Sequence, residues 1–140
     1  MTSKTTELFL EIKPQAASRV RVTRFGSYHT KNYTEFREQC WFMLNKLKAK
    51  YPANDSCYGI KLEFIMKKPQ KPANKYPIMD LDNLEKAILD ALIHCQLFMI
   101  DDVQVIKLSS TKRYQRSGEP FGIRLKVTEY SEEEMLQMLT

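Results

Sequence analysis

The segment that most constrains the fold is residues 58–108, where several local patterns follow one another without a break. Apolar and polar residues alternate over residues 58–66, which predicts a strand with one buried face. A loop with three prolines and four lysines follows at residues 67–77. Residues 83–94 carry apolar side chains at helical spacing, and residues 103–108 are apolar enough for another strand. The segment therefore predicts strand, loop, helix and strand in that order.

The remaining residues add elements on both sides of this segment. Residues 8–12 predict a strand, and the alternation around Val20 and Val22 predicts a second strand or an extended arm that ends before Gly26. Residues 31–50 predict an amphipathic helix, residues 121–127 a strand, and Ser131 the N-cap of a short helix. We predict a single α+β domain over residues 1–140, with a mixed β-sheet, two main helices and a short C-terminal helix.

Length and composition set the class of protein. A chain of 140 residues with 43% hydrophobic residues can bury one core. No apolar run reaches the roughly 18 residues of a transmembrane helix, and the polar N-terminus is not typical of a signal peptide. Cys40, Cys57 and Cys95 lack the spacing of metal ligands and predict reduced thiols in or near the core. We therefore expect a cytoplasmic protein without a membrane partner.

Charge is distributed unevenly along the chain, which has a net charge of +5. Residues 1–79 contain fifteen Lys or Arg against six Asp or Glu, whereas residues 80–140 contain seven against eleven. A basic first half can attract a polyanion such as nucleic acid. Charge alone does not decide the matter, because basic faces are just as often simply solvated.

Two acidic pairs stand at the two ends of the predicted 83–94 helix: Asp80 with Asp82, and Asp101 with Asp102. Each has a structural interpretation, since Asp82 fits a helix N-cap and the second pair fits a turn. A cap needs only one carboxylate, however, and side chains two residues apart on an extended chain share a face. We expect the chain to fold back and bring the two pairs together, with Lys86 one turn after Asp82.

Carboxylates in this number favour a hard cation, Mg²⁺ or Mn²⁺. Zinc does not fit, because His94 and Cys95 are adjacent and the chain has no CxxC or HxxxH motif. The sequence also lacks a Gly-rich phosphate loop, so we expect no nucleotide cofactor. The chemistry that fits is metal-assisted hydrolysis of a phosphodiester, in which the metal activates water and Lys86 stabilises charge on the phosphate.

Three short stretches carry a recognisable pattern: DLDNLEKA at residues 80–87, LDAL at residues 89–92 and DDVQV at residues 101–105. Together they resemble the signature of RusA-type Holliday junction resolvases, a family common in bacteriophages and prophages. The resemblance implies a RusA-like fold and a homodimeric endonuclease of DNA recombination and repair. Such an enzyme makes paired cuts in a four-way DNA junction with Mg²⁺ or Mn²⁺, in a bacterial or phage-infected cell.

Carried over position by position, the resemblance implies catalytic, metal-binding roles for Asp80, Asp82 and Asp102 and an essential role for Lys86. Asp101 matches the preceding family aspartate, whose role is less central, and it is a candidate metal ligand or a helper of the ligands. A two-fold dimer suits paired cuts, because it supplies two symmetry-related sites. Three basic segments are expected on the DNA face, where phosphate contacts give affinity with little sequence information. Their residues are Arg19, Arg21, Arg24, Lys67, Lys68, Lys71, Lys75, Lys112, Arg113 and Arg116.

Two other functions stay open at this point. The chain could be a non-catalytic DNA-binding accessory protein of replication or recombination, in which the aspartates only cap helices. It could also be a nuclease of broader range that cuts flaps or other branched DNA.

Overall fold

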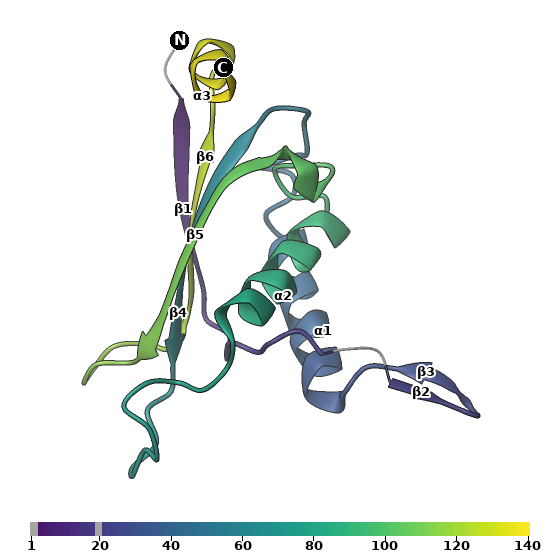
Figure 1. Ribbon diagram of the computed structural model, residues 1–140, viewed down its shortest axis with the longest axis vertical. Helices are drawn as coiled ribbons and strands as arrows, with labels where there is room; N and C mark the ends of the chain where they lie inside the picture. The colour runs from purple at the N-terminus through teal and green to yellow at the C-terminus, as the bar shows by residue number, and fades with distance from the viewer. Residues whose placement is uncertain (1–2, 19–20) are drawn as a thin grey trace.

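A mixed four-stranded sheet with two long helices on one face makes up the body of the described residues (Figure 1). The computed structural model describes residues 3–18 and 21–140, without the side chains of Arg21, Ser27 and Tyr28. The sheet order is β1-β6-β4-β5, formed by Lys4–Leu10, Gly122–Glu129, Tyr58–Met66 and Val105–Tyr114. Strand β6 lies antiparallel between β1 and β4, and β5 runs parallel to β4 at the far edge.

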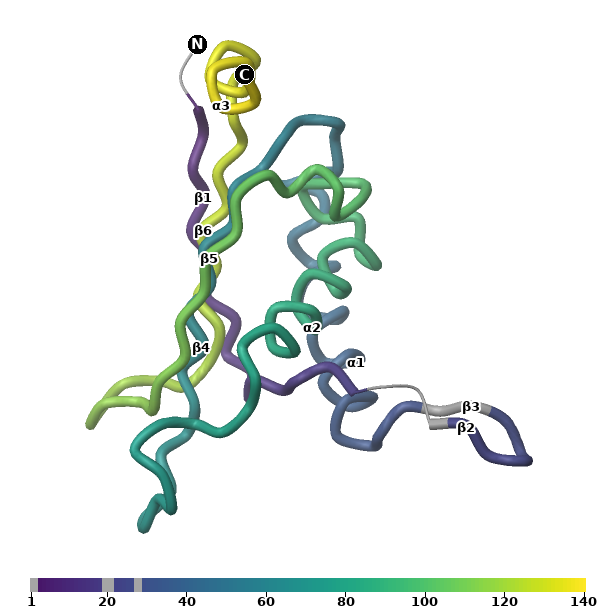
Figure 2. Tube along the Cα trace, in the orientation of Figure 1, coloured from purple at the N-terminus to yellow at the C-terminus, as the bar shows by residue number. Residues whose placement is uncertain are grey.

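Helix α2 (Leu81–His94) is the crossover between the two parallel strands. Parallel neighbouring strands need such a connection, because the chain must return to the end of the sheet at which the first strand began. Tyr58 pairs with Val105 and Met66 with Tyr114, so β4 and β5 start at the same end of the sheet and finish at the other end. Helix α2 therefore begins near the end of the sheet where β4 finishes, and it ends near the opposite end of the sheet, where β5 begins (Figures 1 and 2).

The core lies between the sheet and the two helices. Helix α1 (Lys31–Asn45) packs beside α2, and each helix buries a stripe at helical spacing. These stripes are Tyr33, Phe36, Cys40 and Leu44 in α1, and Leu84, Ala87, Ile88, Ala91 and Leu92 in α2. Strand β4 is buried along most of its length because β5 and β6 flank it on both sides. Burying one such aliphatic side chain stabilises the fold by about 1.5–3 kcal/mol.

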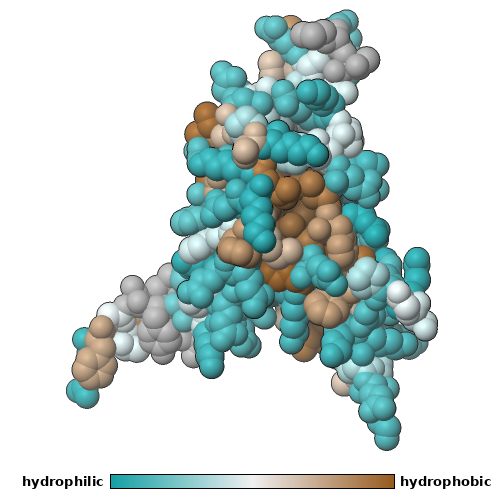
Figure 3. Space-filling view, turned by 180° about the vertical axis from the view of Figure 1, so that it is seen from behind, coloured by the Kyte–Doolittle hydropathy of each residue, from teal (hydrophilic) through white to brown (hydrophobic). Residues whose placement is uncertain are grey.

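Two projections extend from the end of the body opposite the chain termini. One is the hairpin of β2 (Arg21–Thr23) and β3 (Gly26–Tyr28), which precedes α1. The other consists of residues 67–80, after β4, and the turn between β5 and β6 (Figure 2). From behind, the two projections diverge below a central apolar area (Figure 3). Helix α3 (Glu132–Leu139) lies at the other end, beside the N-terminus (Figure 1).

The predicted fold class is confirmed: α+β, with a mixed sheet, two main helices and a short C-terminal helix. Strand 58–66 and the Ser131 cap are also confirmed, since the Ser131 hydroxyl accepts a hydrogen bond from the Glu134 N–H. All three cysteines are free. No helix among the described residues is long and apolar enough to cross a membrane.

Several boundaries differ from the sequence predictions. Helix α1 ends at Asn45 rather than at residue 50. Residues 46–50 form turns in which hydrogen bonds span three residues instead of four, as from Leu47 N–H to Leu44 O. The strand predicted at 103–108 is β5, which starts at Val105 and continues to Tyr114. Its second half is polar, as is common for an edge strand, so apolar alternation did not reveal it. Strand β3 was not predicted.

Candidate functional site

The first acidic pair, Asp80 and Asp82, lies at the start of α2. Asp80 is the N-cap residue, because its carbonyl accepts the first helical hydrogen bond, from Leu84 N–H at 3.0 Å. The prediction that Asp82 is the cap was therefore wrong by two residues; Asp82 lies in the first turn. The Asp80 side chain makes no capping hydrogen bond, and both carboxylates are exposed. The Asp82 carboxylate accepts from the Asn83 N–H at 3.0 Å and so satisfies one N–H of the first turn, whereas capping does not account for the Asp80 side chain. Both charges also suit the positive end of the helix dipole.

Strand β5 holds the segment that leads into the first acidic pair. The Lys112 ammonium donates a hydrogen bond of 2.7 Å to the Met79 carbonyl, directly before Asp80. The Tyr114 hydroxyl donates to the Tyr76 carbonyl at 3.3 Å. Further along α2, the Ser110 hydroxyl donates to Glu85 at 2.8 Å. These bonds fix the start of α2 against the sheet, so that the position of Asp80 depends on β5.

The second acidic pair, Asp101 and Asp102, begins a short 3₁₀ helix, η1 (Asp102–Gln104). Asp101 is its N-cap and accepts from Val103 N–H at 3.2 Å, while the Gln104 side chain accepts from Asp101 N–H at 3.0 Å. Asp102 has no capping role. Its hydrogen bond with Asp101, followed by desolvation and the like charge of Asp101, raises the pKa of Asp102 above its ordinary value. The structure therefore holds two exposed carboxylates close together.

Lys86 projects towards the second acidic pair rather than the first. Its ammonium donates to Asp90 Oδ2 at 3.1 Å, one turn further along α2. That hydrogen bond is the main cause of a raised pKa for Lys86, and the charge of Asp102 contributes in the same direction. Lys86 therefore stays protonated in an acidic neighbourhood. Asp90 was not predicted as a site residue, although its position four residues after Lys86 was visible in the sequence.

The two acidic pairs do not come together within one chain, so the expected fold-back was wrong. They lie at opposite ends of α2, and a helix of 14 residues is about 21 Å long. The parallel arrangement of β4 and β5 requires this separation. Accordingly, the described residues contain no group of three or more His, Cys, Asp or Glu side chains able to hold a metal ion.

A basic groove of about 950 Å³ lies between residues 67–80 and the turn that follows β5. Its cationic lining residues are Lys68, Lys75, Lys112, Arg113 and Arg116, and it also contains Tyr76 and Tyr114. No Asp or Glu in the part of the chain that the structure describes lines this groove. Lys67 and Lys71 are exposed on the same loop. The groove therefore brings together five of the ten residues predicted to contact DNA, and Lys67 and Lys71 lie on the loop that forms one of its sides.

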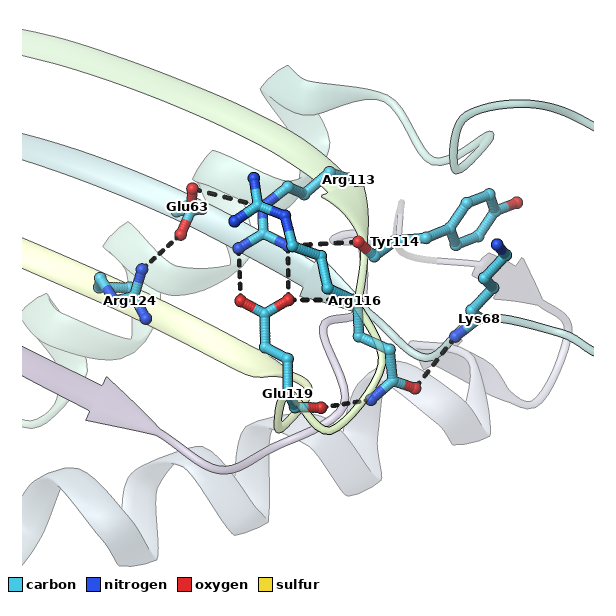
Figure 4. A network of polar contacts seen from close by, with 8 residues as sticks. Glu63, Lys68, Arg113, Tyr114, Arg116, Glu119 and Arg124 are labelled. Carbon is cyan, nitrogen blue, oxygen red and sulfur yellow. Dashed lines mark hydrogen bonds and ion pairs between the residues drawn. The ribbon is translucent and has the colours of Figure 1, made fainter.

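Not all of these cations are free for a ligand. The Arg113 guanidinium forms two hydrogen bonds with Glu119, of 2.6 and 2.7 Å, and an ion pair with Glu63 at 3.5 Å (Figure 4). The bond to Arg113 is the main cause of a pKa of about 2 for Glu119. Arg113 thus organises the turn, while Lys68, Lys75 and Arg116 are exposed or lie at the rim.

The remaining predicted cations belong to the segment before α1. Arg24 is exposed at the tip of the β2–β3 hairpin, with its guanidinium 4.9 Å from the centre of the Phe25 ring. Arg21 lies in β2 with its side chain undescribed, and Arg19 lies outside the described residues. The hairpin is at the same end of the molecule as residues 67–80 and the turn between β5 and β6, the segments that form the basic groove (Figure 2).

Comparison with known proteins gives one clear result. The family model described as endodeoxyribonuclease RusA matches residues 11–128, well over half of the chain. The match includes both acidic pairs, Lys86 and the basic groove, and it ends before α3. No curated protein matches the chain.

Proposed function

Because the chain belongs to the endodeoxyribonuclease RusA family, we propose that it is a Mg²⁺-dependent endodeoxyribonuclease that resolves four-way DNA junctions by paired phosphodiester hydrolysis. Family membership supports endonuclease action on branched DNA. The observation that carries the finer proposal is the presence of two exposed acidic pairs at the ends of α2, with protonated Lys86 between them.

The donor atoms fit Mg²⁺ or Mn²⁺. Every candidate ligand is a carboxylate oxygen, and Mg²⁺ uses only one or two protein carboxylates beside water and substrate phosphate. Asp101 and Asp102 are held close enough to raise the pKa of Asp102, a repulsion that a bound cation would relieve. Asp80, Asp82, Asp101 and Asp102 would hold the ion. A bound ion would neutralise charge on the scissile phosphate and acidify a water molecule.

The separation of the two pairs supports a homodimer. In an isologous two-fold dimer both subunits use the same surface patch, so two copies of a helix that pack across a two-fold axis perpendicular to them run antiparallel. If the α2 helices met in this way, the first acidic pair of one subunit would lie beside the second acidic pair of the other. Two such sites would form, one for each opposed strand of a junction. In this proposal, α2 separates the two acidic pairs of each subunit, and the dimer combines them into two sites that make the paired cuts.

The chain's own residues have defined tasks in this proposal. Lys86, held by Asp90, presents a positive charge beside the second acidic pair, where it can stabilise charge developing on a phosphate. Lys112 fixes the carbonyl of Met79 and thereby the start of the first pair. The basic groove adjoins that segment and offers cations to phosphates of the DNA arms. Its affinity for DNA should fall steeply as salt is raised.

The direct test is cleavage of a synthetic four-way junction with and without Mg²⁺, beside a linear duplex and a flap substrate of the same sequence. We expect Asp82→Asn and Asp102→Asn to reduce cleavage by at least about 100-fold and to leave junction binding intact. Asp55→Asn is the matched control, because Asp55 is an exposed aspartate outside both pairs.

Each alternative function predicts a different result in this test. Binding without Mg²⁺-dependent cutting by the wild-type protein would favour a non-catalytic accessory protein. Equal cutting of junction, flap and duplex would favour a nuclease of broader range. Normal cleavage by Asp82→Asn would contradict the assigned site.

A further inference from the structure

A second polar cavity, of about 490 Å³, lies between α1 and α2, and of its lining residues the proposed cleavage uses Lys86 and its partner Asp90. It lies on the side of α2 that carries Lys86 and Asp90. The lining residues that matter for its chemistry are Tyr33, Arg37, Trp41, Lys86, Asp90 and His94. Among these, Arg37 and Lys86 are cationic, and Asp90 is the one carboxylate of the described residues that lines the cavity.

Arg37 is the best-positioned cation in this cavity. It is half-buried, with its guanidinium 5.5 Å from the centre of the Tyr33 ring and 4.8 Å from that of Trp41. These rings lie four residues away on either side, so the helix itself holds the guanidinium between them. No carboxylate among the described residues forms an ion pair with Arg37. Its N–H donors are therefore available to an anionic ligand.

The opposite wall comes from α2. Lys86 donates to Asp90 at 3.1 Å, and these two residues and Arg37 lie close enough to Tyr33 for their charges to act on its hydroxyl. Arg37 and Lys86 carry two positive charges against the single negative charge of Asp90, before His29 and His94, which also line the cavity, are counted. The cavity is thus a small cationic site with hydroxyl and ammonium donors, suited to a phosphate group.

Trp41 makes a nucleobase a poorer ligand than a phosphate. One face of its indole stacks on His94, with ring centres 3.8 Å apart and planes at 14°. Arg37 covers the indole at 4.8 Å from the ring centre. With both contacts in place, Trp41 forms a fixed wall rather than a free stacking platform of the kind that binds bases.

We propose that this cavity binds a phosphate group of the DNA substrate away from the scissile bond, with Arg37 as its principal ligand. The assignment of the phosphate to DNA rests on the proposed function, whereas phosphate binding itself does not. Because the cavity shares Lys86 with the cleavage site, a phosphate held here would set how far the strand extends before it reaches the acidic residues.

The test uses the only tryptophan of the chain, since Trp41 lines the cavity and its fluorescence reports on Arg37 and His94. The full-length protein is titrated with inorganic phosphate at constant ionic strength, with chloride as the reference. We expect a saturable change, weakened about tenfold or more in Arg37→Gln. Arg37→Lys keeps the charge without the fork of donors and should give an intermediate effect. Lys46→Gln is the control, because Lys46 lies on α1 over Phe42, outside the cavity.

A second titration identifies the source of the phosphate. Short single strands with and without a 5′-phosphate are compared in competition with inorganic phosphate. Competition by both strands supports a backbone phosphodiester, whereas competition by the 5′-phosphorylated strand alone assigns a terminal phosphate and overturns the backbone assignment. A fluorescence signal that does not respond to phosphate, or an equal response in Arg37→Gln and Lys46→Gln with both variants folded by circular dichroism, would overturn the site. Absence of Mg²⁺-dependent junction cleavage by the wild-type protein, with Arg37-dependent phosphate binding retained, would instead refute the proposed function.

Discussion

Mixing two inactive variants, Asp82→Asn and Asp102→Asn, should restore DNA cutting if each site is shared between subunits. The reason is the length of α2. The two acidic pairs are separated by a helix of 14 residues, about 21 Å long. Two oxygens bound to one Mg²⁺ each lie about 2.1 Å from it, so they are at most about 4 Å apart. The aspartate side chains of one chain cannot bridge that difference, so a metal site that uses both acidic pairs would need a second chain.

The expected magnitude follows from the symmetry. In a mixed dimer, one site receives both altered residues and the other site receives neither. Random assortment makes about half of the dimers mixed, each with one of its two sites intact. Cutting should therefore return to about one quarter of the wild-type rate. It should produce single nicks rather than paired cuts, because the second site of each mixed dimer stays inactive.

The assay uses a four-way junction with each strand labelled, analysed on denaturing gels after Mg²⁺ is added. Co-expression with two different affinity tags isolates mixed dimers directly. The matched control mixes Asp80→Asn with Asp82→Asn, since two changes in the same pair leave both sites defective. Isolated mixed dimers of Asp82→Asn and Asp102→Asn that stay as inactive as this control would refute a site shared between subunits.

Three further predictions concern the fold around the site. Lys112→Met should remove the hydrogen bond to the Met79 carbonyl, lower the free energy of unfolding in urea by about 1 kcal/mol and weaken junction cleavage. Alkaline pH should destabilise the protein, because burial raises the pKa of Cys40 from 9.0 to about 12 and, with other causes, that of Tyr58 from 10.0 to about 12. The contributions of Cys40 and Tyr58 to the free energy of unfolding are fully present below pH 9, where neither group ionises in the unfolded chain. Both contributions are lost as the pH rises towards 12. The Cys40 part is about 4 kcal/mol, which urea midpoints across this range would measure. Gly122→Ala should lower the melting temperature, at a cost of about 1–3 kcal/mol, because its Cβ would meet a backbone carbonyl of β1.

Each of these predictions has a result that would contradict it. Lys107→Met, an exposed change on the same strand, is the control for Lys112→Met, and equal cleavage by the two variants would exclude a positioning role. A urea midpoint that stays constant from pH 9 to 12 would show that the two groups ionise equally in both states. A Gly122→Ala variant that melts with the wild type would mean that β1 can shift to accept a methyl group.

Elements with a strong period were predictable from the sequence, and elements without one were not. The alternation in β4 and the apolar stripe of α2 predicted both elements correctly, because burial against one shared core imposes both sequence patterns. Strand β3 has only three residues, Gly26–Tyr28, which is too short for any periodicity. The polar half of β5 is a strand because β4 offers it a partner, not because its own residues favour one.

The relation between the two acidic pairs was the main error, and the sequence held a clue to it. A hairpin needs only a short turn, whereas a connection that contains a helix of 14 residues favours a parallel neighbour. A parallel neighbour places Asp80 and Asp102 at opposite ends of the sheet, measured along the strands. The Arg37 cavity shows a different limit. The spacing of Tyr33, Arg37 and Trp41 is visible in the sequence, but the opposing wall depends on how α1 and α2 pack.

The position of β6 has a consequence for how the protein is made. This strand pairs with β1 on one side and β4 on the other, in a register that joins Lys4 to Glu129. Until β6 leaves the ribosome, the first strand of the nascent chain has no neighbour and the sheet is split. Such distant pairing folds slowly and late. The protein therefore completes its sheet only after residues 122–129 have emerged, so a nascent chain without them lacks the full framework on which a nuclease site is arranged.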